Sequence, residues 1–273
     1  MAENSRMQRR QVAQKPINYK RPLAFIFWLM ISLIMALGTF FNPAFLKGSI
    51  TSSSNTTVVT QQMNSHFNRL ATIVGGNSSD QNMLSDKQTR QIANLIIDYQ
   101  YGFHIFRADD DELATQIKDV ALTSEKTDTS QAKDIRKKLK RQKSSAIYIV
   151  SNAFDLATVT LVANLITVFR IVAILVLIIC LIALFSILHE SLSLYSVKRT
   201  IHEAMAGLMW ASFWLMLISG FLSVIPLFMD TTIITIADIG YILELSSGIF
   251  LDFVIVGAVC YIASALPWEL TSE

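Results

Sequence analysis

Between Gly102 and Gly207 the chain contains neither glycine nor proline, and within this stretch it changes from a charged segment into a long apolar one. The apolar part, residues 157–187, includes a single charged residue, Arg170. Because about 20 apolar residues suffice to cross the hydrocarbon core of a bilayer as a helix, this run predicts a membrane span. Three similar runs lie elsewhere in the chain, so the sequence predicts a polytopic membrane protein.

The composition supports this class. The 273 residues are 52% hydrophobic and 16% charged, whereas about 25% are charged in soluble domains. The net charge of +2 gives no indication of nucleic-acid binding. Both cysteines, Cys180 and Cys260, lie in apolar runs, so the polar parts contain no disulfide framework. We interpret the cysteine-free polar region as typical of a bacterial envelope protein.

Lysine and arginine residues next to the spans predict the orientation. The N-terminal tail carries six of them, the link after the second span carries Lys198 and Arg199, and the link between the third and fourth spans carries none. We therefore expect both termini in the cytoplasm and the large polar segment outside the cell membrane. A cleavable signal peptide is the alternative for the first run, but residues 23–41 exceed a signal core and lack a clear cleavage site.

The expected fold is an all-α membrane protein: a four-transmembrane-helix bundle with an extracytoplasmic helical domain inserted between helices 1 and 2. The expected segments, in order, are a cytoplasmic basic tail (1–22), transmembrane helix 1 (23–45), the extracytoplasmic helical domain (46–145), a stalk and transmembrane helix 2 (146–188), a cytoplasmic link (189–206), transmembrane helix 3 (207–229), a short outer loop (230–241), transmembrane helix 4 (242–268) and a cytoplasmic tail (269–273).

Helix signals recur within the polar domain. Serine, threonine and asparagine dominate residues 48–57, which predicts a flexible exit from the membrane. Helical spacing of apolar residues begins near Met63 and ends at Gly75-Gly76-Asn77. Ser85 is expected to cap the next helix, which Gly102 ends, and the acidic residues 109–112 favour the start of another.

The transition into the second span has two interpretations. No residue from about Ala132 to His189 requires a break, so we expect one long helix that begins outside as a stalk and continues into the membrane. The alternative is a tight hairpin of two spans, residues 146–166 and 168–188. Residues 167–170 contain no turn-forming residue, which disfavours the hairpin.

Three ionisable residues in the apolar runs are candidates for function, because exposing a charge to lipid costs at least about 2.5–3.5 kcal/mol. Glu244 and Asp252 share a face of the fourth span, and Arg170 and Asp252 are expected at depths that differ by about one helical turn. The three residues would form either an intramembrane charge pair that fixes the helix register or a proton or cation path. Few polar residues occur on the other spans, which favours the structural role.

Polar groups outside the spans provide weaker candidates. Residues 133–143 contain seven cations and one aspartate, which predicts a solvated helix face or a contact with an anionic surface through Arg136, Lys137, Lys138, Lys140 and Arg141. Two His-Glu steps, at residues 189–190 and 202–203, lack the converging ligands of a metal site. His66 and His104 fit partly buried structural positions. We assign no catalytic residue, metal or cofactor.

These features predict a non-enzymatic integral membrane protein of the envelope, whose extracytoplasmic domain binds a partner or ligand in an accessory, sensor or scaffold role. The expected partners are the lipid bilayer, a protein of the membrane or envelope, and an anionic lipid or wall polymer, but no nucleic acid. The alternatives are a small oligomeric transporter or channel that uses Arg170, Glu244 and Asp252, and a membrane enzyme that uses the His-Glu steps.

Overall fold

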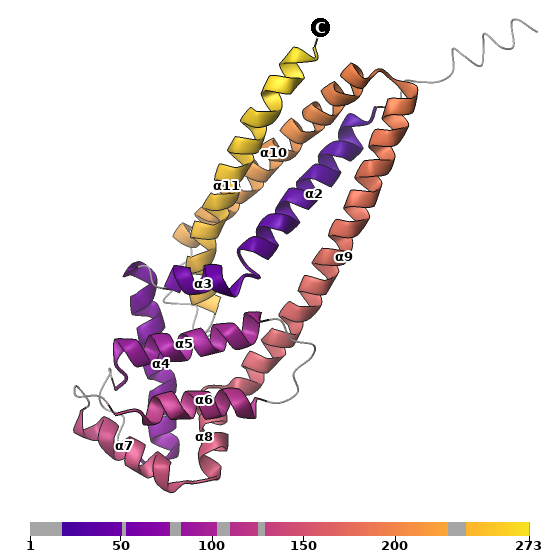
Figure 1. Ribbon diagram of the computed structural model, residues 1–273. Coiled ribbons are helices and arrows are strands. Elements are labelled where there is room, and N and C mark those ends of the chain that lie inside the picture. The colour runs from indigo at the N-terminus through magenta and orange to yellow at the C-terminus, as the bar shows by residue number, and fades with distance from the viewer. Residues whose placement is uncertain are drawn as a thin grey trace, which may run out of the picture. The chain divides into compact units, whose positions relative to one another are not determined.

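The computed structural model describes residues 18–50, 53–76, 83–102, 110–124, 129–228 and 239–272. Across these residues the regular secondary structure is entirely α-helical, which confirms the expected all-α class. Four helices are long and apolar enough to cross a membrane (Figure 1), so the chain has the features of a multi-pass membrane protein. They are α2 (Lys20–Gly38), α9 (Leu156–Leu194), α10 (Val197–Phe228) and α11 (Ile239–Leu270).

Six shorter helices lie between α2 and α9 in the sequence, and we call them the helical cluster. They are α3 (Pro43–Ile50), α4 (Ser53–Ile73), α5 (Asp86–Tyr101), α6 (Asp111–Leu122), α7 (Ser130–Arg141) and α8 (Ser145–Ala153). Helix α3 contacts α5, α5 contacts α6, and α6 contacts α7. Helices α4 and α8 contact each other, and α4 also contacts α5 while α8 contacts α6.

The chain divides into two compact units. Unit 1 consists of residues 1–33, 176–221 and 250–273, and unit 2 consists of residues 34–175 and 222–249. The whole helical cluster therefore belongs to unit 2, together with the beginning of α9. Unit 1 contains the first part of α2, the end of α9 and the larger parts of α10 and α11.

Unit 2 has an apolar core supplied by the inner faces of the helical cluster. Phe67, Leu70, Ile92, Ile117 and Leu139 are all less than 2% exposed and come from α4, α5, α6 and α7. Each helix contributes apolar residues at helical spacing, as amphipathic helices around one core do. The burial of these side chains explains why the short helices hold together.

Several helix ends lie where local features of the sequence predict them. The Ser85 hydroxyl accepts a hydrogen bond from the backbone N–H of Gln88 at 3.2 Å, and the Gln88 side chain accepts one from Ser85 N–H at 3.1 Å. This reciprocal pair is a capping box. Gly102 ends the same helix, as expected. Gly75 has a φ of +71°, and a Cβ on Gly76 would lie 2.8 Å from the Ile135 side chain.

Two expectations about the helical cluster are wrong. The flexible exit expected over residues 48–57 is helical where the structure describes it, because α3 reaches Ile50 and α4 begins at Ser53. The long unbroken helix from Ala132 is divided into α7, α8 and α9, with Lys143 and Asp155 at φ values of 47° and 49°. The two turns allow α7 and α8 to bury their apolar faces in the core of unit 2, which a straight stalk could not do.

The membrane helices of unit 1 approach closely at small residues. A Cβ placed on Gly207 of α10 would lie 3.0 Å from Leu23 Cβ of α2, and one on Gly257 of α11 would lie 3.2 Å from the Ser212 carbonyl of α10. Such contacts are typical of helices in lipid. Large apolar side chains such as Phe185 and Phe221 are exposed, as lipid-facing residues are. Most of the expected outer loop, residues 230–241, lies outside the described residues.

Candidate functional site

Arg170 lies on α9 and binds backbone carbonyl groups of two other segments of unit 2. Its Nη2 donates hydrogen bonds to the carbonyl oxygens of Phe41 at 2.5 Å and Tyr101 at 2.7 Å, and its Nη1 donates to that of Gly102 at 3.4 Å. Phe41 lies between α2 and α3, and the other two carbonyls end α5. The last carbonyls of a helix have no intrahelical partner and carry partial negative charge. Arg170 thus fastens the helical cluster to α9.

Two further polar contacts attach α5 within unit 2. Lys47 of α3 forms an ion pair with Asp98 at 2.5 Å. The Tyr99 hydroxyl lies 3.0 Å from the Thr160 hydroxyl of α9. The Asp98 and Lys47 side chains are partly exposed, so this ion pair contributes less than about 1 kcal/mol. Arg170 is the more important attachment, because its charged guanidinium donates to three carbonyl groups and these contacts are partly buried.

The remaining intramembrane candidates are less well defined. Asp252 is half-buried on α11 in unit 1, whereas Arg170 belongs to unit 2. Glu244 lies in the α11 backbone, but its side chain is outside the described residues. A pair between Arg170 and Asp252, and a proton or cation path along Glu244 and Asp252, therefore stay predictions.

Arg136 has a different role from the one expected. It is 5% exposed, so it is not available to an anionic surface, and this corrects the expectation from sequence. Its Nε donates to the Ala121 carbonyl at 2.8 Å and its Nη2 to Gln88 Oε1 at 3.2 Å. Gln88 is also buried and donates to the Thr123 carbonyl at 2.7 Å. The two side chains connect α5, α7 and the end of α6.

The helical periodicity of α7 could have identified Arg136 as an inward residue. The buried residues of α7 are Ala132, Ile135, Arg136 and Leu139, which recur every three or four positions. Its exposed cations fall on the opposite face or in the turn that follows. We define the basic face of α7 as Lys133, Lys137, Lys140, Arg141 and Lys143, all of which are exposed. Lys138 is half-buried and pairs with Asp134 at 2.9 Å.

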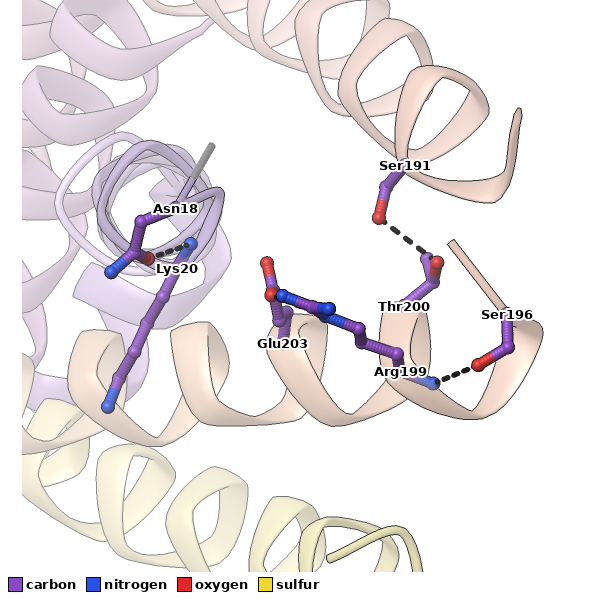
Figure 2. A network of polar contacts seen from close by, with 7 residues as sticks. All are labelled: Asn18, Lys20, Ser191, Ser196, Arg199, Thr200 and Glu203. Atoms are coloured by element: carbon purple, nitrogen blue, oxygen red, sulfur yellow. Dashed lines mark hydrogen bonds and ion pairs between the residues drawn. The ribbon is translucent and has the colours of Figure 1, made fainter. Parts of the chain in front are cut away.

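A polar network connects the end of α9 with the beginning of α10 in unit 1 (Figure 2). The hydroxyls of Ser191 and Thr200 are 3.0 Å apart, and Arg199 Nε lies 3.5 Å from Glu203 Oε1. The Arg199 guanidinium also stacks over the Tyr195 ring at 4.1 Å. The network therefore stabilises the turn between two membrane helices.

The two His-Glu steps have separate partners in unit 1. The Tyr19 hydroxyl donates to Glu190 at 2.9 Å, and His202 Nδ1 lies 3.2 Å from the Trp268 carbonyl. His189 stacks on Phe185. Within the described ranges, no three histidine, cysteine, aspartate or glutamate residues are grouped closely enough to hold a metal ion. Burial and the hydrogen bond to Glu190 raise the pKa of Tyr19.

His66 has the buried structural position expected from its sequence context. It is 8% exposed, its Nδ1 lies 3.2 Å from the Ala153 carbonyl, and its ring stacks on Phe154 at 5.4 Å. His104 lies outside the described residues. No family model matches the chain, and no curated protein or solved structure matches it.

Proposed function

We propose that this chain is a non-enzymatic integral membrane protein of the bacterial envelope that binds a polyanionic envelope polymer through the basic face of α7. In this proposal, both termini are cytoplasmic and residues 46–145 lie outside the cell membrane. The observation that carries the proposal is the separation of α7 into a buried inner face and an exposed cationic outer face. The helical cluster would act as an accessory or scaffold domain.

The charge of the basic face supports an anionic ligand. Its five cations are exposed, while Asp134, the one acidic residue between positions 133 and 143, is paired with Lys138. Four of the five cations are lysines, whose compact ammonium groups act as point charges with little geometric selectivity. A flexible polymer with repeated negative charges matches this surface better than a ligand whose anionic groups must each accept two hydrogen bonds in a fixed geometry.

The place of α7 in unit 2 favours a polymer over membrane lipid. Helix α3 directly follows the α2 membrane helix, and the contacts run from α3 to α5, from α5 to α6 and from α6 to α7. Figure 1 shows α3 and α7 at opposite ends of this series. The basic face thus lies at the end of the helical cluster away from the end of α2.

The attachment of the helical cluster supports a mechanical role. Arg170 binds carbonyl groups at both the α2–α3 connection and the end of α5, so a load on the cluster is transmitted to α9. The buried pair Gln88–Arg136 connects α7 to α5 and α6. A surface that binds a polymer needs this kind of support if it is to hold an envelope component near the membrane.

The test is binding of inorganic polyphosphate of defined length to the full chain in neutral detergent. We expect Lys133→Glu/Lys137→Glu/Lys140→Glu to weaken binding by about threefold to 150-fold, because each of the three exposed charge contacts contributes about 0.2–1 kcal/mol. The matched control is Arg69→Glu/Lys87→Glu/Arg90→Glu, which makes the same charge change at exposed positions on α4 and α5. Equal loss in both variants would contradict a role for the basic face.

The orientation is tested separately in intact cells. A cysteine at exposed Lys143 should react with a membrane-impermeant maleimide, whereas one at exposed Ser196 should react only after the membrane is opened. The native cysteines lie within membrane helices α9 and α11, and a variant without them gives the background. The opposite labelling pattern would place the helical cluster in the cytoplasm and would contradict binding of an envelope polymer.

A further inference from the structure

Unit 1 contains a groove between the first turns of α2 and the middle of α10. Its volume is about 680 Å³, within the range of small-molecule sites. Phe25, Trp28, Trp210, Trp214 and Ile218 supply most of an apolar lining. Lys20 and Arg21, at the start of α2, supply two positive charges. The groove is therefore amphipathic.

A second, smaller groove of about 290 Å³ is also lined by Lys20 and Trp210 and continues to Trp268 of α11. All four tryptophans of the chain line one or both grooves. Tryptophan favours the boundary between lipid headgroups and acyl chains, because its ring is apolar and its N–H is polar. The grooves thus lie at the level expected for headgroups at one end of unit 1.

No acidic residue among those that the structure describes neutralises the two cations of the larger groove. Neither Lys20 nor Arg21 forms an ion pair in the part of the chain that the structure describes. Lys20 Nζ lies 5.4 Å from the centre of the Trp210 ring, and Figure 2 shows its side chain directed away from Glu203. The N-terminal 21 residues contain four further cations and one acid, Glu3. An anionic ligand would supply the missing negative charge.

The length of the groove suits an acyl chain below an anionic headgroup. Trp210, Trp214 and Ile218 recur every four residues along α10 and span about 12 Å at about 1.5 Å per residue. The cations occupy the first turn of α2, and Trp28 follows two turns later. A phospholipid presents the same order of chemistry, with a phosphate followed by hydrocarbon.

We propose that the larger groove is a binding site for one anionic phospholipid, whose phosphate contacts Lys20 and Arg21 and whose acyl chain lies against Trp28 and Trp214. Lipid tails in the surrounding bilayer are as apolar as the groove, so burying a tail there gives little preference for one phospholipid over another. Selectivity must come from the headgroup. Each cation near the membrane surface favours anionic lipid by about fivefold.

The tryptophans allow a direct test. The full chain is reconstituted in phosphatidylcholine bilayers that contain increasing fractions of brominated phosphatidylglycerol or brominated phosphatidylcholine, whose bromine atoms quench tryptophan on contact. We expect half-maximal quenching at about a 25-fold lower fraction of the anionic lipid, because each of the two cations contributes about fivefold. In Lys20→Gln/Arg21→Gln, this preference should fall to less than about twofold. Equal quenching of the unaltered protein by both lipids would overturn the proposal.

Two further variants separate the groove from general attraction to a charged surface. Arg9→Gln/Arg10→Gln removes the same charge from the N-terminal tail and should retain the preference. Ala24→Phe fills the groove, which Ala24 lines, and should reduce quenching by the anionic lipid while Lys20 and Arg21 remain. If the tail variant loses the preference as completely as Lys20→Gln/Arg21→Gln, the anionic lipid is attracted diffusely and the groove is not a site.

Discussion

The helical cluster of unit 2 and the membrane helices of unit 1 bury opposite kinds of side chain. In the cluster, Phe67 is fully buried, whereas Phe221 on α10 is 72% exposed. At the α10–α11 contact, the close approach depends on Gly257 and Ser212. The same residue type is therefore core in one region and surface in the other, as expected if water surrounds the first region and lipid surrounds the second.

Buried polar groups also differ between the two regions. In the cluster, Asn64 Oδ1 accepts hydrogen bonds from the N–H groups of Met83 and Leu84, at 2.8 and 2.9 Å. Such bonds give buried backbone N–H groups a partner that the apolar core cannot provide, and they fix the position of the segment before the next helix. In the membrane helices, Ser264 instead returns its hydroxyl to the Cys260 carbonyl of its own helix. Polar side chains specify tertiary contacts in the cluster but mostly local ones in α11.

The largest predicted effect on stability is at a buried phenylalanine of the helical cluster. Phe67→Ala should lower the free energy of unfolding of the helical cluster by about 3–5 kcal/mol, because it removes a large buried ring and leaves a cavity. Phe221→Ala removes the same ring from an exposed position and should change stability by less than about 0.5 kcal/mol. Denaturant unfolding of the full chain in detergent micelles measures both. Similar losses would show that Phe221 is buried in an assembly.

An intermediate effect is expected at Arg170. Arg170→Gln removes charged hydrogen bonds to Phe41, Tyr101 and Gly102 and should cost about 1.5–3 kcal/mol. Lys47→Gln removes only a partly exposed ion pair and should cost less than about 1 kcal/mol. The same unfolding measurement applies, with proteolysis of the cluster as a second readout.

Combining Arg170→Gln with Asp252→Asn distinguishes the carbonyl contacts from an ion pair. If the carbonyls are the main partners of Arg170, the second substitution adds its own small effect without recovering the loss. Recovery of protein level and stability in the double variant would instead identify a charge pair between Arg170 and Asp252. Loss of ion flux in vesicles at normal protein level would support the transport alternative.

Much of the fold was predictable because its signals are local or periodic. Hydropathy located the four spanning helices. Ser85, Gly102 and the Gly75-Gly76 pair marked helix ends, since capping and left-handed φ depend on the residue itself. The breaks at Lys143 and Asp155 were not predictable in this way, because neither residue is glycine or proline, although aspartate tolerates a left-handed φ better than most residues do. They form because the turned chain buries α7 and α8 in the core.

The partners of individual charges were harder to predict. Backbone carbonyls bind Arg170 and leave no pattern in the sequence, so these contacts were not predictable, while a pair between Arg170 and Asp252 stays a prediction. Arg136 appeared to belong to a basic surface because six other cations surround it. Its helical spacing from Ala132, Ile135 and Leu139 shows why it points inward. For Arg136, the periodicity of the buried residues was therefore more informative than the number of neighbouring charges.

The smallest expected effect compares a tyrosine from each region. Burial raises the pKa of Tyr101 in the helical cluster, whereas burial and the hydrogen bond to Glu190 together raise the pKa of Tyr19 in unit 1. A raised pKa means that the folded state holds its proton after the unfolded chain has lost it. The stability that Tyr19 contributes is therefore present below pH 10 and is lost as the pH rises through the folded-state value.

Glu190→Gln separates these two causes. It removes the negative charge beside Tyr19, so the pKa of Tyr19 should move toward 10 while that of Tyr101 stays unchanged. The ultraviolet absorbance of phenolate follows both groups, and Tyr19→Phe and Tyr101→Phe assign the transitions. An unchanged Tyr19 transition would mean that burial alone controls its proton, as in the helical cluster, and the contrast between the two tyrosines would disappear.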